Sequence, residues 1–545
     1  MQQKWKHWRL FSGSVFAALG TFLIFLPAMN NKFVELDDFG YIVDNRHIDT
    51  LDWQTVVWAF TQFHEANWHP LTMLSLALDR RIWGLTPSGF HLTNVIIHSC
   101  TVFCVCFLFA SLLKVASLNG PSTETWNPCN LPVTVGSIAG ALLFGLHPLR
   151  VESVVWASER KDVLCLFFTV AALWCYLRYA EQRSVRPLEH FASFGTYWSV
   201  LFMACLALLS KPTAVSLPLV LLIVDWYPLA RITDRHSFLG AVKEKVPLFL
   251  MTCGAGILTV VAQNYAIIQA PVVGASSRLL VACKALIFYL WKILWPAGLS
   301  PIYPHPGNVI ESAPLEYLLY ASVVATICIT ATLLGRRLRI WPALWLYYLV
   351  TLAPMLGIIQ VGGQWIADRY TYLPALGISL LWGGGGAWLV GRLRQKGHAG
   401  LAMFLIGVAV CQLVSYAGLT LRTIPYWRNT ETIATRVIDI MPRQVGAAYY
   451  ARAKYRNEKG EYGRALEDVD AAMSIALRRA SKSRYAELSM TQSKILRNLG
   501  RLPEALAAAD WAIQTSVVEP PVEYIEFRNE LAQNLADNPS LPQLQ

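Results

Sequence analysis

Two adjacent carboxylates, Asp37 and Asp38, follow the first long apolar run of the sequence by only a few residues. Close carboxylates repel each other, which raises the pKa of one of them and creates a proton acceptor suited to general-base chemistry. If the apolar run crosses a membrane, this pair stands within reach of a membrane-embedded substrate. A charged loop that is merely exposed to water explains the same residues, and spacing alone does not separate the two interpretations.

The most strongly charged stretch between the apolar runs contains Glu152 and the run Glu159-Arg160-Lys161-Asp162. Arginine binds a phosphate through paired hydrogen bonds and lysine binds it as a point charge, so the stretch could hold the phosphate of a lipid. An internal salt-bridge cluster that caps a helix is an equally good interpretation. Two later segments each add a cation, Lys211 and Arg369. Arg369 is the better phosphate candidate, because Lys211 could simply extend its charge to the membrane surface.

His69 lies in the segment Asn67-Trp68-His69-Pro70 and could bind a metal or relay a proton. A single histidine beside a tryptophan is more often a hydrogen-bonded structural residue, and His64 lies five positions away, off the same helical face. None of the 11 cysteines forms a CxxC pair. The sequence therefore predicts no metal site and no disulfide framework.

The composition places these residues in a membrane protein. Of the 545 residues, 55% are hydrophobic and only 15% are charged, whereas a soluble chain carries roughly 25% charge. Apolar runs close to the ~20 residues that cross a bilayer recur from Leu10 to Leu419. The net charge of +11 is scattered over short loops, which favours membrane orientation over a nucleic-acid partner.

We expect an all-α bundle of about eleven membrane spans. The expected spans are 10–29, 91–113, 131–147, 163–180, 191–209, 213–229, 246–266, 315–334, 340–360, 371–391 and 400–420. A further apolar segment, 279–295, carries Lys284 and Lys292 and is expected to lie in the membrane interface. Counting it as a crossing would put the next basic loop on the non-cytoplasmic side. Basic loops mark the cytoplasmic side, so the N-terminus lies inside and the charged segments above lie outside.

The chain changes character after the membrane domain, residues 1–425, because charge and alanine-rich helical periodicity become frequent. Residues 426–520 contain two similar segments, 460–466 and 500–506, each starting with Gly and each followed six residues later by Ala. This pattern predicts a short tetratricopeptide-repeat domain with two repeats. We expect residues 521–545 to form a partly disordered extension.

Taken in chain order, these motifs resemble the transmembrane-and-tetratricopeptide-repeat (TMTC) O-mannosyltransferase family and its bacterial relatives. The matching segments are Asp37-Asp38, Asn67 to Thr72, Gly89 to Asn94 with His98, His147 to Glu152, Glu159 to Asp162, Lys211-Pro212 and Asp368 to Tyr370. The resemblance spans nearly the entire chain. It implies a branch of the C-type glycosyltransferases, which use polyprenyl-phosphate sugars as donors on the non-cytoplasmic face.

By this resemblance, Asp37 and Asp38 are the catalytic residues, and Arg160, Lys161 and Arg369 bind the donor phosphate. The supporting residues are Glu152, Glu159, Asp162, His69 and Lys211. The family resemblance implies a donor in which a sugar, a hexose such as mannose, is linked to a lipid. It also implies a hydroxyl acceptor on a protein or glycan, and no required metal or other cofactor. The short repeat array is more typical of the bacterial branch, which predicts a bacterial inner membrane with periplasmic repeats, or the ER membrane in a eukaryote.

Two other classes of function remain open at this point. A membrane-anchored scaffold would use the C-terminal repeats to recruit a protein, with the charged loops serving only assembly. A transporter fits less well, since few ionisable residues lie in the middle of the apolar runs, where a transport site is found.

Overall fold

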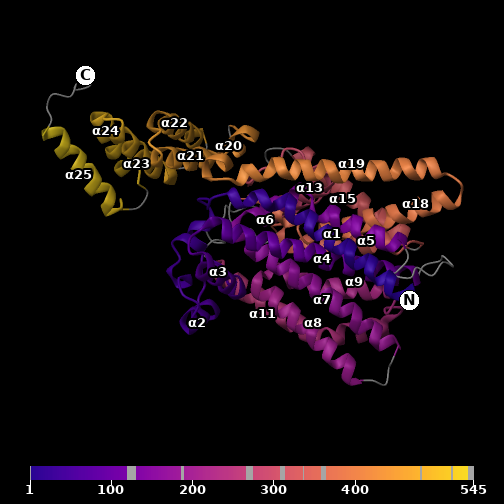
Figure 1. Ribbon diagram of the computed structural model, residues 1–545. Helices are drawn as coiled ribbons and strands as arrows, with labels where there is room; N and C mark the ends of the chain where they lie inside the picture. The colour runs from indigo at the N-terminus through magenta and orange to yellow at the C-terminus, as the bar shows by residue number, and fades with distance from the viewer. Residues whose placement is uncertain are drawn as a thin grey trace. The chain divides into compact units, whose positions relative to one another are not determined.

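The structure is a computed structural model, and it describes residues 2–118, 131–185, 190–264, 274–306, 314–335, 337–357, 364–442, 444–478, 482–516 and 519–537 (Figure 1). The chain forms two compact units. The membrane unit consists of residues 1–33, 37–299 and 305–425, and the C-terminal unit consists of residues 34–36, 300–304 and 426–545.

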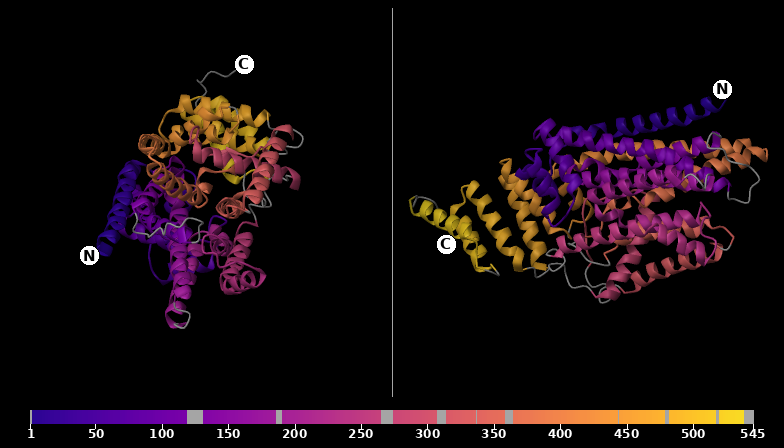
Figure 2. Two further views of the ribbon diagram at one scale, coloured as in Figure 1. Left: turned by 90° about the vertical axis from the view of Figure 1, so that its right-hand side faces the viewer. Right: turned by 90° about the horizontal axis from the view of Figure 1, so that it is seen from below.

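The membrane unit is built from helices that pack side by side, as the two further views in Figure 2 show. Its longer helices are α1 (Gln2–Phe25), α4 (Pro87–Leu118), α5 (Leu131–Gly145), α7 (Arg160–Val185), α8 (His190–Ser210), α11 (Val246–Ala262), α13 (Ala275–Leu294), α15 (Pro314–Gly335), α16 (Ile340–Leu352) and α19 (Ala399–Thr423). Shorter helices are α2 (Trp53–Thr61), α3 (Pro70–Trp83), α6 (Val151–Val155), α9 (Leu217–Trp226), α10 (Arg235–Glu244), α17 (Ala375–Leu380) and α18 (Gly386–Gln395). The predicted all-α character fits this architecture, which adds only the two short strands β1 (Tyr303–Pro304) and β2 (Gln364–Ile366) in the described ranges.

In the part of the chain that the structure describes, five helices are long and apolar enough to cross a membrane, and each overlaps a predicted span. They cover Trp8–Asn30, Pro87–Ser117, Ala157–Arg183, Pro314–Gly335 and Ala399–Trp427. Counting each of two bent helix pairs as one span raises the number to seven. Three shorter helices are also apolar. The expected count of about eleven therefore stays a prediction, as does the interfacial position of residues 279–295, which fall in α13.

The two bends occur where a proline follows the break. Leu131–Gly145 and Pro148–Val155 meet at 55°, and Arg235–Glu244 meets Val246–Ala262 at 58°. Proline lacks the backbone N–H that would continue the helical hydrogen bonds, and its ring clashes with the preceding turn. Pro148 thus ends the straight path of α5 and directs the charged stretch after it into a separate set of short helices.

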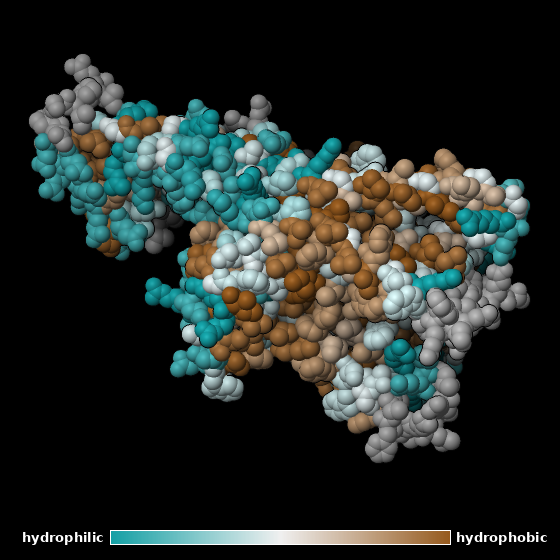
Figure 3. Space-filling view, viewed as in Figure 1, coloured by the Kyte–Doolittle hydropathy of each residue, from teal (hydrophilic) through white to brown (hydrophobic). Residues whose placement is uncertain are grey.

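Large apolar side chains cover the outside of the membrane unit, where Figure 3 shows hydrophobic residues gathered. Phe16 and Leu23 of α1, Leu315 of α15 and Phe404 of α19 are all exposed. Water would disfavour so much contiguous apolar surface, whereas the hydrocarbon of a bilayer accommodates it. The exposed faces of these helices therefore indicate contact with lipid.

The C-terminal unit consists mainly of helical hairpins. Its helices are α20 (Thr430–Ile440), α21 (Gly446–Glu458), α22 (Tyr462–Arg478), α23 (Lys482–Asn498), α24 (Leu502–Gln514) and α25 (Val522–Asp537). Helix α21 packs on α22 and α23 packs on α24. The turns inside these two hairpins contain Gly460 and Gly500, whose φ angles of +79° and +75° are rarely adopted by other residues.

The alanines of the two similar segments are buried where the helices of each hairpin meet. Ala465 and Ala472 of α22, and Ala505 and Ala512 of α24, are at most 1% exposed. A small side chain at such a position lets two helices approach closely. The extension 521–545, expected to be partly disordered, contains the helix α25, while its last residues, 538–545, lie outside the described residues.

Candidate active site

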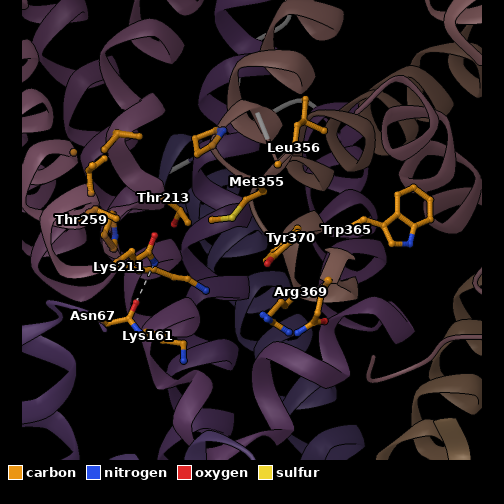
Figure 4. A pocket seen from close by; sticks show the side chains of 18 of the residues that line it. Asn67, Lys161, Lys211, Thr213, Thr259, Met355, Leu356, Trp365, Arg369 and Tyr370 are labelled. Carbon is orange, nitrogen blue, oxygen red and sulfur yellow. Dashed lines mark hydrogen bonds between the residues drawn. The ribbon is translucent and has the colours of Figure 1, made fainter. Parts of the chain in front are cut away.

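A cavity of about 420 Å³ opens among loops of the membrane unit (Figure 4). Its lining includes Asp37, Lys161, Lys211 and Arg369, which come from four separate segments of the chain. Figure 4 shows the ends of Lys211 and Arg369 lying close together at one side of this space. The volume falls within the range of about 300–1,000 Å³ that is usual for sites binding small molecules.

Local backbone structure presents each of these cations to the cavity. Lys161 belongs to the first turn of α7, directly after the short helix Ala157–Glu159. Lys211 is extended, with φ −158° and ψ 136°, because the following Pro212 disfavours a helical conformation at the residue before it. Arg369 lies in a 3-10 helix, Asp368–Thr371, that follows β2.

A single buried carboxylate, that of Glu159, connects the three cations. Its Oε1 lies 3.3 Å from Lys161 Nζ and 3.4 Å from Arg369 Nε, and its Oε2 lies 3.2 Å from Lys211 Nζ. Three like charges in one cavity would repel one another, and the shared carboxylate offsets part of that repulsion. Glu159 itself is 1% exposed, so these contacts are shielded from water.

Two further acids contact Lys211 and Arg369. Asp162 Oδ1 lies 2.6 Å from Lys211 Nζ, while Glu152 forms an ion pair with the Arg369 guanidinium and accepts its backbone N–H at 2.8 Å. Burial by itself would lower the pKa of Arg369, but the Glu152 carboxylate raises it well above its usual value. Burial would likewise lower the pKa of Lys211, which Asp162 and Glu159 instead raise. Both side chains are therefore cationic at neutral pH.

The two neighbouring carboxylates of the first loop have different surroundings. The Asp37 side chain is 45% exposed, lines the cavity and places its Oδ2 3.1 Å from Lys161 Nζ. Asp38 is fully buried, and its Oδ1 accepts the backbone N–H of Ser158 at 2.9 Å. Of the pair, only Asp37 lines the cavity among the described residues. A general base must reach a substrate hydroxyl, and this geometry favours Asp37.

Arg160 does not line the cavity, although the sequence singled it out as a phosphate ligand. Its guanidinium is fully buried, with Nη2 2.5 Å from Asp79 Oδ2, Nη1 2.8 Å from Ser75 Oγ, and further bonds to Asn94 and the carbonyl of Phe90. All of its donor nitrogens are thus engaged by protein acceptors. A structural role explains Arg160 better, because the buried carboxylate of Asp79 on α3 needs a cation.

His69, the residue before α3, lines the cavity and is 4% exposed. Burial lowers its pKa well below 6.5, and the positive charges of Lys161 and Lys211 act in the same direction. Its Nδ1 has no hydrogen-bond partner within the described part of the chain. A neutral imidazole in this place can accept or donate one hydrogen bond to a bound molecule.

Several polar residues at or beside the cavity were not named as site residues from the sequence. Tyr41 does not line the cavity but contacts one of its cations: the centre of its ring lies 4.7 Å from Lys161 Nζ, and burial raises the pKa of its phenol to about 12, so the ring meets the cation in its neutral form. Asn67 and Gln263 are linked by a hydrogen bond of 3.4 Å, and Gln364 also lines the space. These polar residues sit beside apolar runs, but that position alone does not tell which of them share a cavity. No group of three or more His, Cys, Asp or Glu arranged to hold a metal occurs in the ranges the structure describes.

Two further cavities lie along α7. A small cavity of about 30 Å³ is lined by Asp162, Leu166 and Thr169, and a larger one of about 160 Å³ by Leu173 and Leu177 of the same helix. These residues recur every three or four positions and therefore lie on one face of α7. From Asp162 to Leu177 the helix rises by about 22 Å, at 1.5 Å per residue. The remaining walls of the larger cavity come from α4, α9, α16, α17 and the following π-helical turn Leu381–Gly385.

Comparison with known proteins finds similarity to protein O-mannosyl-transferases. No family model matches the chain. Human protein O-mannosyl-transferase TMTC4 is 23% identical over 488 residues, which is 81% of this chain, and human protein O-mannosyl-transferase TMTC1 is 23% identical over 458 residues, which is 76%. The chain is TMTC-like. A shorter stretch of 150 residues in this TMTC-like protein is 31% identical to the Drosophila melanogaster protein O-mannosyl-transferase Tmtc1, and the chain spans only 63% of the length of human TMTC4 and 48% of human TMTC1.

Proposed function

We propose that this protein is a membrane glycosyltransferase that moves a sugar, a hexose such as mannose, from a polyprenyl-phosphate donor to a hydroxyl of a protein or glycan acceptor. One observation carries the proposal: Asp37 and the cations Lys161, Lys211 and Arg369 line the same cavity. A carboxylate suits the deprotonation of a hydroxyl, and clustered cations suit a phosphate leaving group. The names of the TMTC relatives support the same class of reaction.

The transfer is a single displacement. Asp37 accepts the proton of the acceptor hydroxyl as its oxygen forms a bond to the anomeric carbon of the sugar. The bond between that carbon and the phosphate oxygen breaks, and the electron pair leaves with the polyprenyl phosphate, whose charge Lys161, Lys211 and Arg369 stabilise. Attack from the face opposite the leaving group inverts the anomeric configuration. These cations take the part that a divalent metal plays elsewhere, so the reaction needs no cofactor.

The two cavities along α7 support a donor with a long hydrocarbon tail. The phosphate would lie near Lys211 and Arg369, and the tail would follow the face that carries Leu166, Leu173 and Leu177. Burying apolar tail surface there contributes roughly 25 cal/mol per Å². A nucleotide sugar has no such tail and would leave these cavities empty.

The distribution of basic loops supports a site on the non-cytoplasmic face. We place the protein in a bacterial inner membrane with its N-terminus in the cytoplasm and its C-terminal unit in the periplasm. The helical hairpins of that unit then meet acceptor proteins in the compartment where transfer occurs.

The test uses the purified full chain in lipid vesicles with radiolabelled mannosyl polyprenyl phosphate and a mixture of periplasmic proteins. We expect label in an alkali-labile, O-linked product. The variant Lys211→Met should lose transfer, because it removes one cavity cation. The matched variant Arg178→Gln, which removes a cation that stacks on Trp174 and does not line the cavity, should retain it. Transfer from GDP-mannose in place of the lipid donor would overturn the proposal, as would the absence of any transfer.

A further inference from the structure

The C-terminal unit contains two short segments that lie far from it in the sequence. Residues 34–36 and 300–304 belong to this unit, while the chain on either side of each belongs to the membrane unit. The first segment is followed directly by Asp37 and the second directly by His305. Both Asp37 and His305 line the cavity. The C-terminal unit therefore holds the chain one residue away from two places in the candidate site.

The contacts that hold the first segment come from α20 and α21. The backbone N–H of Glu35 donates to Thr430 Oγ1 at 2.9 Å, and the Glu35 carboxylate forms an ion pair with Lys454. Val34 is only 2% exposed. Backbone, side chain and an apolar neighbour thus fix the position of the segment.

The second segment is held by hydrophobic packing. Ile302 packs against the buried cluster of Ala434, Val437, Ile438 and Val445 in the same unit. A residue from outside the repeats therefore completes this hydrophobic cluster. Two repeats alone bury too little apolar surface for an independent core, which gives a physical reason for this arrangement.

We infer that the C-terminal unit positions the catalytic carboxylate, with Thr430 and Lys454 as positioning residues for Asp37. This inference rests on the proposed function, because it takes Asp37 as the base. Peptide planarity leaves two soft dihedral angles per residue, so fixing Glu35 restricts the region that the Asp37 carboxylate can reach. Displacing a reacting group by about 1 Å is enough to lower a rate by about 100-fold, so even modest loosening is measurable.

Two matched sets of variants separate positioning from simple loss of folding. Thr430→Val keeps the shape but removes the acceptor of the Glu35 N–H, whereas Thr430→Ser keeps the acceptor. We expect Thr430→Val to lower kcat about fivefold, with KM for the lipid donor unchanged, and Thr430→Ser to retain wild-type kcat. In the second set, Glu35→Lys and Lys454→Glu should each lower kcat about two- to fivefold, and the double charge swap should restore it.

The control is Arg464→Glu, which reverses a charge in the same unit on a side chain that is 70% exposed and pairs with Glu461, three residues away on the chain. It should leave kcat unchanged. An equal loss of activity in Arg464→Glu, or failure of both Thr430→Ser and the charge swap to restore kcat, would overturn the inference.

A second readout keeps the inference testable if the protein transfers no sugar at all. A spin label attached to Asp37→Cys reports the mobility of this position without turnover, and the unsubstituted chain treated alike gives the background of the native cysteines. We expect Thr430→Val to raise the mobility of the label and Thr430→Ser to leave it low. Unchanged mobility in Thr430→Val overturns the positioning role, whereas raised mobility in a chain without transferase activity supports that role and removes only the proposed reaction.

Discussion

Replacing Asp37 with Asn removes the proposed base while keeping the shape of the side chain. Loss of general-base assistance costs about 10²–10⁴ in rate, or about 3–5 kcal/mol of transition-state stabilisation. The cost to stability is far smaller, because the Asp37 side chain is 45% exposed and its ion pair with Lys161 contributes at most about 1 kcal/mol. Asp37→Asn should therefore abolish measurable kcat in reconstituted vesicles while leaving the melting temperature nearly unchanged.

The neighbouring residue supplies the contrast. Asp38 is fully buried and accepts the Ser158 N–H, so Asp38→Asn should reduce activity only together with thermal stability, by about 1–3 kcal/mol. Asp44→Asn, an exposed carboxylate in the same loop that does not line the cavity, is the control and should behave as wild type. The reasoning is refuted if Asp37→Asn keeps more than about a tenth of the wild-type kcat, or if Asp38→Asn loses all activity while its melting temperature is unchanged.

Three further predictions concern stability. Arg160→Gln leaves the buried carboxylate of Asp79 without its cation and should lower the free energy of unfolding by about 3–5 kcal/mol, seen as loss of folded protein in size-exclusion chromatography. A folded variant with weakened donor binding would instead support Arg160 as a phosphate ligand. The folded-state pKa of His69 is lowered below 6.5, so the unfolded chain binds more protons and the stability of the fold falls as the pH drops below that value. Between about pH 7 and about pH 5, the melting temperature of His69→Gln should therefore fall less than that of the wild type. An equal fall would contradict the lowered pKa. Gly500→Ala forces a side chain into a φ of +75° with open space around it, so it should destabilise the C-terminal unit by about 1–2 kcal/mol in thermal unfolding, while no change would indicate that the turn relaxes freely.

The ion pairs of the cavity explain how three cations can lie close together in one place. Glu159 contacts all three of them, Asp162 also pairs with Lys211, and Glu152 also pairs with Arg369. Buried ion pairs of this kind contribute little net stability, because desolvation offsets the attraction. Their consequence is positional: the cations are already oriented, and the phosphate of the proposed donor would not have to order them.

Much of the fold was predictable from the sequence because its signals are local. Twenty-residue apolar runs, prolines at helix breaks and a glycine that starts each hairpin turn act within a few residues of themselves. The helices at 87–117 and 399–427 and the hairpins around Gly460 and Gly500 follow from such signals. The span count does not, since the bent pairs and shorter apolar helices cannot be counted by length alone.

The site was less predictable than the fold, because the sequence shows the type of each residue but not the direction of its side chain. Asp37 and Asp38 are the same amino acid, yet one lines the cavity and the other is buried against Ser158. Arg160 and Lys161 are adjacent cations at the start of α7, where neighbouring side chains point about 100° apart. The sequence by itself determined that acids and cations gather in the loops between apolar helices, and only the tertiary structure decided which of them meet, since Asp79, Lys211 and Arg369 come to this place through packing between helices far apart in the chain.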